Sequence, residues 1–270
     1  MEMLTPRKRL SFTGNGGELF SVMIVNWLLT FVTLGLYYPW AKARRLQYFY
    51  DHLELDAHPF HFRGTGREMF IGFIKAVVLF GVIYGAFFAL TWMQEDWASI
   101  LAFLILFSSI IALAPLVIHG TYRYRMGRSS WRGIHFGYRG DLKELYGICI
   151  RDGLLTLVTF GIYGFWWQRD IFNYYVNNLS WNFPEGRRIQ FRSTATGGGF
   201  FGLLVGNFFL VVFTLGVGLA WAHVRMMRYI MSNVEMVGDA DLDSVVQTEQ
   251  EHASATADEL GDIMDIGIFL

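Results

Sequence analysis

Charged residues are scarce in this sequence. Only 17% of the 270 residues are charged and 53% are hydrophobic, whereas soluble domains usually carry about 25% charged residues. This balance argues against an ordinary soluble domain and favours a chain that faces lipid. Aromatic residues, by contrast, are abundant, with 25 Phe, 9 Trp and 13 Tyr. Membrane proteins concentrate such rings at the level of the lipid headgroups, so the aromatic content indicates the same environment.

Cysteine is nearly absent. Cys149 is the only one and lies in an apolar run, which excludes an intramolecular disulfide and implies no oxidising compartment. The amino terminus also lacks the short apolar core of a cleavable signal peptide, because its basic residues lead into a Gly-rich polar stretch. We therefore expect no cleaved leader.

Basic residues are missing from the carboxyl-terminal segment that runs from Tyr229 to Leu270, which holds ten acidic residues. Residues 1–228 carry all 22 Lys and Arg and the other 13 acidic residues, a net charge of +9. This asymmetry divides the chain into a membrane domain, 1–238, and an acidic C-terminal tail, 239–270. The tail either docks on the basic body or on a protein partner, or is disordered.

Two apolar segments are long enough to span a bilayer, whose hydrocarbon core of about 30 Å needs about 20 residues. They are Met69–Met93 and Ala98–His119, with only "QEDW" between them, and they predict a transmembrane hairpin. Three further apolar segments each contain a polar residue and a Gly near the carboxyl end: Leu19–Tyr38, Leu145–Trp167 and Phe200–Trp221. Whether these three cross fully is left open by the sequence.

The loops 40–68, 120–144 and 168–199 are all basic. The positive-inside rule favours the cytoplasm for the first two, which agrees with the hairpin between them. Five simple crossings cannot place every basic loop on one side. Either some basic loops lie outside, or the Gly-broken segments re-enter and return to the cytoplasmic face, where protein or a water-filled cavity must cover the irregular backbone.

One block occurs three times: "TLGLYYPWAKARRLQYFYDHL" from Thr33, "TFGIYGFWWQRDIFNYYVNNL" from Thr159 and "TLGVGLAWAHVRMMRYIMSNV" from Thr214. In each copy Gly follows the Thr by two residues, Trp by seven and Tyr by fifteen. A degenerate fourth copy, "ALAPLVIHGTYRYRMGRSSW", follows the predicted hairpin. Such recurrence indicates internal repeats.

Each unit begins with a Phe-containing segment that leads into Gly, as in "FHFRGTGREMF" and "IQFRSTATGGGFF". Its period-two alternation predicts a short strand, and "PEGR" predicts a hairpin turn. The sequence therefore predicts a mainly α, polytopic α-helical membrane protein with internal repeats and short cytoplasmic β-hairpins. We place the four degenerate units at about 10–59, 60–133, 134–188 and 189–238.

The Gly after each Thr permits the backbone angles that end a helix. Beyond this break we predict an amphipathic helix that lies at the headgroups, with Trp and Tyr at the interface and Arg near lipid phosphates. The predicted interfacial residues are Trp40, Arg44, Arg45, Tyr48, Trp166, Arg169, Tyr174, Trp221, Arg225, Arg228 and Tyr229. The expected partners are membrane lipids with anionic headgroups.

A polar residue precedes the Thr of each copy by seven positions, which is about two helical turns, so both lie on one helix face. These faces are expected to point inward, where they line a path or form contacts between repeats. The candidate binding residues are Asn26, Thr33, Arg151, Asp152, Thr159, Asn207 and Thr214. Arg151 and Asp152 lie within an apolar run, where charges are costly and are either functional or a structural pair.

His52, His58 and His61 form the tightest cluster of potential metal ligands. A metal site would need a further ligand and suitable geometry, so we predict no metal and no cofactor. No nucleic-acid partner is expected. No nucleophile–base arrangement is visible, which makes an enzyme the least supported class of protein.

The block from Thr33, the segment "FHFRGTGREMF" and the acidic tail resemble the YjgN-like family of bacterial inner-membrane proteins, a family of unknown function. The similarity covers essentially the whole chain. One departure is "VGLAW" in the last unit, which lacks the aromatic pair of "LYYPW". The resemblance implies a multi-pass protein of the bacterial inner (plasma) membrane, and it implies no reaction, ligand or catalytic residue.

Two classes of function remain. One is a transporter or channel for a small solute or lipid, with the polar helix faces lining its path. The other is a non-catalytic membrane scaffold or regulator that binds partners through the cytoplasmic strands and the acidic tail.

Overall fold

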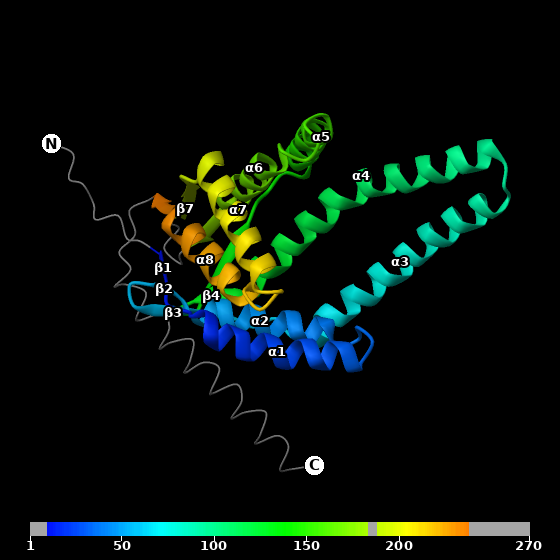
Figure 1. The fold of residues 1–270 in the computed structure, drawn as a ribbon. Helices are drawn as coiled ribbons and strands as arrows, with labels where there is room; N and C mark the ends of the chain where they lie inside the picture. The colour runs from blue at the N-terminus through cyan, green and yellow to red at the C-terminus, as the bar shows by residue number, and fades with distance from the viewer. Residues whose placement is uncertain (1–9, 183–187, 238–270) are drawn as a thin grey trace, which may run out of the picture.

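The computed structural model describes residues 10–182 and 188–237 (Figure 1). The predicted acidic tail, 239–270, lies outside the described residues. The helices are α1 (Gly16–Val32), α2 (Tyr38–Asp51), α3 (Gly66–Trp92), α4 (Asp96–Gly127), α5 (Leu142–Val158), α6 (Gly164–Asn177), α7 (Gly197–Phe213) and α8 (Leu219–Ser232). The strands are β1 (Leu10–Phe12), β2 (Leu53–Leu55), β3 (His58–Phe62), β4 (Ser129–Trp131), β5 (Ile134–Tyr138), β6 (Leu179–Asn182), β7 (Arg188–Ser193) and β8 (Val234–Val237).

The eight strands form one sheet whose spatial order, β1 to β8, is the order of the chain. Every pair of neighbours is antiparallel. Two-residue turns join β2 to β3 and β4 to β5, and both residues of each turn have positive φ, at Asp56–Ala57 and Arg132–Gly133. Such turns match the twist of antiparallel strands and fix the register of the hairpin.

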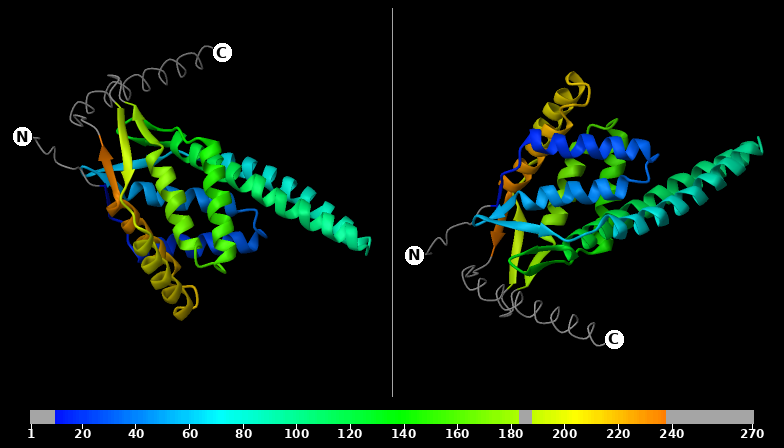
Figure 2. Two further views of the ribbon diagram at one scale, coloured as in Figure 1. Left: turned by 90° about the horizontal axis from the view of Figure 1, so that it is seen from above. Right: turned by 90° about the horizontal axis from the view of Figure 1, so that it is seen from below.

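The order strand, helix, helix, strand occurs four times along the described chain. We name these segments unit 1 (Leu10–Leu55), unit 2 (His58–Trp131), unit 3 (Ile134–Asn182) and unit 4 (Arg188–Val237). Figure 2 shows the strands at one end of the molecule and the helix pairs leading away from them. Each helix pair therefore leaves the sheet and returns to it, so the basic loops between the pairs all lie at the sheet end.

The helices form a closed ring. Each helix packs against the next one along the chain, and α8 packs against α1. The two antiparallel helices of each pair lie side by side because a sharp turn joins them. At three of these turns a Gly has a φ of about +90°, namely Gly35, Gly161 and Gly216. The break predicted from the Thr-x-Gly pattern is confirmed at these positions.

The helix that follows each break packs against the first helix of its pair. We expected an amphipathic helix lying across the headgroups, but α2, α6 and α8 run back along α1, α5 and α7 to the sheet. The apolar face of each returning helix is covered by protein, as Ala43, Leu46 and Phe49 of α2 show. An apolar stripe on a helix can face lipid or a packed core equally well, so the pattern alone could not decide.

Two helices are long and apolar enough to cross a membrane, α3 with 27 residues and α4 with 32. At 1.5 Å per residue they extend about 40 and 48 Å, which exceeds a hydrocarbon core of about 30 Å. The first helices of the other pairs, α1, α5 and α7, have 17 residues each, or about 25 Å. The two apolar segments predicted to form the long hairpin are thus the two candidate spans.

The main core lies where the sheet meets the returning helices. Trp131 and Trp181, on neighbouring units, are fully buried there, and their rings are 5.0 Å apart in an edge-on contact. Aromatic contacts of this kind add about 0.5–1.5 kcal/mol beyond the burial of apolar area. The main core therefore stabilises the sheet end of the molecule.

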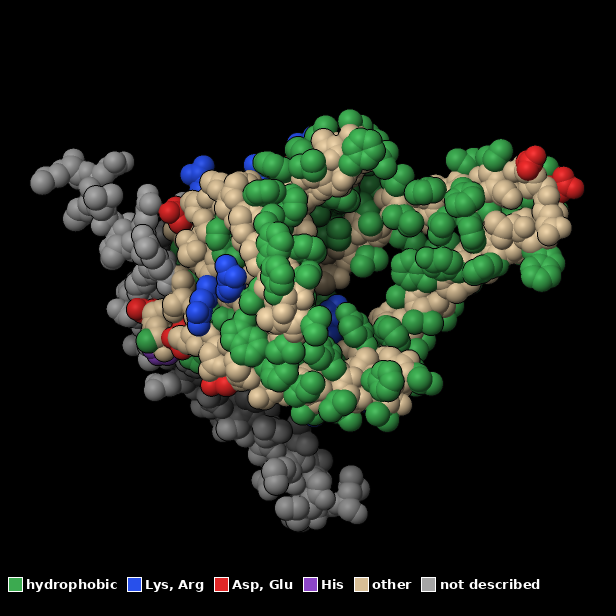
Figure 3. Space-filling view, viewed as in Figure 1, with side chains coloured by type: hydrophobic (Ala, Val, Ile, Leu, Met, Phe, Trp, Pro, Cys, Tyr) green, Lys and Arg blue, Asp and Glu red, His purple; other side chains and the backbone are tan. Residues whose placement is uncertain are grey.

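The surface is divided in the same way. Figure 3 shows hydrophobic side chains over the helices and most charged side chains at the sheet end, with a second acidic group where α3 meets α4. At the other turns the residue before the Gly is an almost fully exposed hydrophobic residue: Leu34 is 94% exposed, Phe160 97% and Leu215 94%. Three apolar tips of this kind would be unfavourable in water.

Candidate functional site

The three polar positions predicted to face inward are all buried. Asn26 is 4% exposed, Asp152 0% and Asn207 8%, and each lies on the first helix of its pair. Asn207 donates to the backbone oxygen of Ala222 on the partner helix, 3.2 Å away. In each of the three side chains one oxygen has no hydrogen-bond partner in the described part of the chain. These residues thus face the neighbouring helices.

The three Thr residues of the repeated block hold the turns. Each hydroxyl donates to the carbonyl four residues earlier, at 2.6–2.7 Å, and accepts from the N–H four residues later, at 2.7–3.0 Å. Thr33 joins Leu29 to Tyr37 in this way, and Thr159 and Thr214 repeat the geometry. The hydroxyls therefore satisfy backbone groups that the helix end leaves open.

Arg151 and Asp152 belong to a network of four charges between α5 and α6. Arg151 Nε donates to Asp152 Oδ1 at 2.6 Å, and Arg151 Nη2 donates to Asp170 Oδ2 at 3.1 Å. Arg169 donates to the same Asp170 from Nη2, at 2.5 Å, and from Nε, at 2.8 Å. Charge-assisted bonds of this length are strong, so this network ties the two helices together.

The repeated Trp residues pack against the next unit. A Cβ atom at Gly66, at the start of unit 2's first helix, would collide with the indole of Trp40 in unit 1. The same contact joins Trp166 to Gly197, and Trp221 of unit 4 to Gly16 of unit 1. Trp40 and Trp221 keep part of their rings exposed, at 37% and 41%. The Trp contacts thus join unit 1 to unit 2, unit 3 to unit 4, and unit 4 to unit 1.

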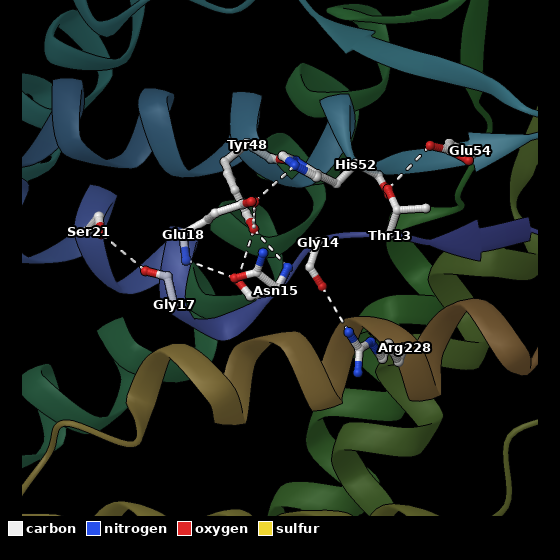
Figure 4. A network of polar contacts seen from close by, with 10 residues as sticks. All are labelled: Thr13, Gly14, Asn15, Gly17, Glu18, Ser21, Tyr48, His52, Glu54 and Arg228. Carbon is white, nitrogen blue, oxygen red and sulfur yellow. Dashed lines mark hydrogen bonds and ion pairs between the residues drawn. The ribbon is translucent and has the colours of Figure 1, made fainter.

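The repeated Tyr residues were assigned to the lipid interface, and for Tyr48 and Tyr174 this was wrong. Both side chains are buried, because each hydroxyl holds the start of its unit's first helix. Tyr48 accepts from the N–H of Asn15 at 3.0 Å and donates to its carbonyl at 2.9 Å (Figure 4). Burial raises the pKa of Tyr48, which keeps the hydroxyl protonated as a donor. Tyr174 donates to the carbonyl of Asp141 at 2.7 Å.

The fourth Tyr of this set was missed in the sequence. In unit 2 the hydroxyl of Tyr124 donates to Glu68 at 2.8 Å, and Glu68 also binds Arg128. In unit 4 Tyr229 is half-buried, and its hydroxyl lies 3.5 Å from the carbonyl of Thr196. Aligning the degenerate copy on Tyr124 would have identified this residue as the fourth member of the set.

The predicted basic interfacial residues have different environments. Arg228 donates to the carbonyl of Gly14 at 3.0 Å, a contact between unit 4 and unit 1 that is drawn in Figure 4. Arg169 belongs to the charge network described above. Arg44 and Arg225 are exposed on α2 and α8, and Arg45 is half-buried. Of these three residues, Arg44 and Arg225 are therefore the ones whose side chains are accessible at the surface.

A cavity of about 250 Å³ lies between the returning helices and the sheet. All four units line it, through matching positions. The residue after the aligned Tyr is Phe49 in unit 1, Arg125 in unit 2, Tyr175 in unit 3 and Ile230 in unit 4. The next residues, Tyr50, Met126, Val176 and Met231, also line it. We call this space the central cavity; Asn26, Asp152 and Asn207 are not among its lining residues.

Arg125 is the one charged side chain among the described residues that line the central cavity. Its guanidinium lies among the side chains of Tyr50, Tyr122 and Tyr175. Its Nε atom is buried and has no hydrogen-bond partner in the described part of the chain. An apolar cavity with a single cation is suited to a molecule that is largely apolar and carries a negative charge.

A second cavity, of about 470 Å³, lies between α2 and the base of the α3–α4 hairpin. Arg125 lines it as well, together with Lys42 of α2 and Glu68 of α3. We call it the lateral cavity. Figure 3 shows the α3–α4 hairpin diverging from the other helices, with open space between them. Arg125 therefore lies between the lateral cavity and the central cavity.

No group of three or more His, Cys, Asp or Glu side chains in residues 10–182 and 188–237 is arranged to hold a metal ion. His58 instead lies against Arg132, within 2.6 Å, and His61 lies 3.5 Å from Asp51. The histidines of the sequence cluster are thus engaged in local contacts at the sheet end.

The family model of a bacterial protein of unknown function, DUF898, matches residues 7–182 and 167–263. The chain belongs to the DUF898 family. It is 34% identical over 149 residues to "Inner membrane protein YjgN" of Salmonella typhimurium, which is 55% of this chain and 36% of that protein. The protein of the same name from Escherichia coli K12 is 25% identical over 160 residues, 59% of this chain and 38% of that one.

The chain thus covers little more than a third of the length of these two relatives. Both relatives are named inner membrane proteins, which supports an inner-membrane location for this chain and confirms the resemblance seen in the sequence. No solved structure matches the chain. The geometry of the cavities is therefore the main guide to what this member of the DUF898 family does.

Proposed function

We propose that units 1 to 4 are internal repeats of one strand–helix–helix–strand module. Three recurrences support this: the Thr-held turn, the Tyr at the base of each helix pair and the Trp against the Gly of the next unit. Units 1, 3 and 4 share the Thr hydroxyl that bonds both sides of the turn and the Gly with a φ of about +90°. Unit 2 has no such break and forms the longer α3–α4 hairpin in its place.

In the proposed topology the sheet lies on the cytoplasmic side, and only α3 and α4 cross the bilayer. The other three hairpins enter from the cytoplasmic side and return to it, because their first helices extend only about 25 Å. Every basic loop then lies in the cytoplasm, as the positive-inside rule prefers. The exposed tips at Leu34, Phe160 and Leu215 end within the hydrocarbon.

Within this membrane protein we assign the central cavity to the acyl part of a lipid-like molecule. The chain is then a lipid-binding protein of the transporter class, with its path running through the lateral and central cavities. The observation that carries the proposal is that all four units contribute aromatic and aliphatic side chains to one central cavity. Exposed Arg44 and Arg225 would contact anionic headgroups at the surface, each contributing about 1 kcal/mol.

This path replaces the one predicted along the polar helix faces. Asn26, Asp152 and Asn207 lie between helices, and neither cavity includes them. Buried polar contacts between membrane helices average about 0.6 kcal/mol, which suits a role in helix association.

The proposal is tested by photolabelling in proteoliposomes with a medium-chain fatty acid that carries a diazirine on its chain, because the central cavity of about 250 Å³ does not hold a longer acyl chain in full. We expect the labelled peptides to contain residues that line the central cavity, above all Met227 and Met231. Labels confined to the outer faces of the hairpin, for example at Val78 and Leu104, would contradict it, since both are exposed on α3 and α4.

A cavity-filling variant gives the matched comparison. Ile230→Trp places an indole ring in the central cavity, and Ile100→Trp places the same ring on the exposed face of α4. Only Ile230→Trp should reduce labelling of Met227 and Met231. Thermal unfolding of both variants in detergent establishes that each one is folded, and equal labelling in two folded variants would count against the central cavity.

A further inference from the structure

Two basic side chains line the lateral cavity together. Lys42 comes from α2 and Arg125 from α4, and both line this cavity. They are close enough for the charge of Arg125 to act on Lys42. Like charges that share a partly buried site repel one another, so an arrangement of this kind is unfavourable unless an anion joins it.

The nearby acidic side chain does not supply that anion. Glu68 also lines the lateral cavity, but it binds Arg128 at 2.5 Å and accepts from Tyr124 at 2.8 Å. No carboxylate in the described ranges, 10–182 and 188–237, forms an ion pair with Lys42 or Arg125. Arg45, on the same helix, adds a further positive charge that acts on Lys42. The lateral cavity therefore has two cations and no counterion from the described residues.

Arg125 differs in kind from the residues that match it in the other units. The three matching positions hold Phe49, Tyr175 and Ile230, which all complete the apolar wall. Unit 2 alone places a guanidinium there, and its buried Nε lacks a partner in the described chain. An apolar residue would fill the same place without the cost of burying a charge.

We propose that Lys42 and Arg125 bind the acidic headgroup of an amphiphile whose acyl chain occupies the central cavity. This rests on the lipid-binding function proposed above and adds the chemical class of the headgroup, a carboxylate or a phosphate. Lys42 meets the headgroup at the lateral cavity, and Arg125, which lines both cavities, holds it at the point where the chain enters. Charge-assisted hydrogen bonds from both side chains provide the selectivity for an acid.

The experiment compares two photoprobes in proteoliposomes, the diazirine fatty acid and its uncharged methyl ester, at a pH where the acid is ionised. The wild-type protein should label with the acid at least about ten-fold more efficiently than with the ester, as expected for a charge-assisted bond. In Lys42→Gln/Arg125→Gln this preference should disappear, while labelling of the central cavity by the ester persists. Arg123→Gln, an exposed cation on α4, is the matched control and should keep the preference.

The outcomes separate the two proposals. Equal labelling of the central cavity by acid and ester in the wild type overturns the headgroup site and leaves the lipid-binding function in place. No labelling of the central cavity by either probe overturns the lipid-binding function itself. If the double variant does not fold, Arg125→Lys and Lys42→Gln are measured singly, and an unchanged acid preference in a folded Lys42→Gln removes Lys42 from the site.

A competition experiment distinguishes binding of an acidic headgroup that carries an acyl chain from binding of a free anion. Inorganic phosphate carries the charge but has no acyl chain, so it should not displace the fatty acid at millimolar concentration. Displacement by phosphate, with the methyl ester unaffected, would assign Lys42 and Arg125 to a soluble anion and overturn the headgroup proposal.

Discussion

At the scale of single residues, the polar side chains within the apolar segments separate into two groups. Asn26, Asp152 and Asn207 are buried between helices. Lys42 and Arg125 line cavities and have no carboxylate partner in the described chain. Contacts between packed helices account for the burial of the first group. They do not account for Lys42 and Arg125, and the functional proposal therefore rests on these two residues.

Asp152 gives a direct test of this division. Asp152→Asn introduces the amide that units 1 and 4 carry at the matching position, and it removes the charge paired with Arg151 at 2.6 Å. We expect the free energy of unfolding to fall by roughly 1–3 kcal/mol, the cost of losing one charged hydrogen-bond partner. Labelling of the central cavity by the fatty-acid probe should not change, because Asp152 lines neither cavity. A variant that is stably folded but is no longer labelled would contradict this division and would support a path along the polar helix faces.

The sequence predicted the first group of residues and missed the second, for a physical reason. Asn26 and Asn207 stand at a fixed distance from a local turn signal, which recurs and can be aligned. Arg125 stands in unit 2, which lacks the Thr-x-Gly turn signal and the Trp of the other units. The only signal for Arg125 is its mismatch with Phe49, Tyr175 and Ile230 once the four Tyr are aligned.

At the scale of the elements, the turn between the helices is the feature most fully set by local sequence. The Thr hydroxyl holds both sides of the turn, and the Gly two residues later has a φ that an L-residue rarely adopts. The direction of the next helix is a tertiary property. It depends on whether lipid or protein covers the apolar stripe of the returning helix. The sequence does not contain this information, and we therefore predicted an orientation at the headgroups.

Gly161→Ala tests the turn of unit 3. The φ of Gly161 is +92° and no atom lies within 4 Å of the place that an added methyl group would take, so the variant changes backbone strain alone. Thermal unfolding in detergent should show a loss of about 1–2 kcal/mol. Gly147→Ala is the control, since it lies within α5 with equally free space. It should be neutral or stabilising by up to about 1 kcal/mol, and equal effects in both variants would contradict the account.

At the scale of the whole molecule, the closed ring and the single sheet are the features that the sequence could least predict. The short strands and the hairpins were expected from alternation and turn residues. Their union into one eight-stranded sheet depends on strands that pair across each helix pair, far apart in the sequence, such as the pairing of Phe60 in β3 with Trp131 in β4. Ring closure depends on Trp221 and Arg228 of unit 4 meeting the start of unit 1.

Gly66→Ala tests the contact between units. The added methyl group would collide with the Trp40 indole, so we expect overpacking to lower the free energy of unfolding by about 1–3 kcal/mol. Gly85→Ala in the same helix, with no atom within 4 Å, should not destabilise. If Gly66→Ala were as stable as Gly85→Ala by thermal unfolding, the Trp–Gly contact would not be a determinant of the ring.

The central claim is that every helix pair returns to the sheet side, because the returning helices build both cavities. Cysteine labelling from outside intact cells tests it most directly, in a Cys149→Ser background and with a membrane-impermeant maleimide. We predict that Glu95→Cys, at the α3–α4 turn, is labelled without permeabilisation, and that Ser11→Cys in β1 is labelled only after it. Phe160→Cys should stay unlabelled under both conditions, and labelling of Phe160→Cys from outside would contradict the claim.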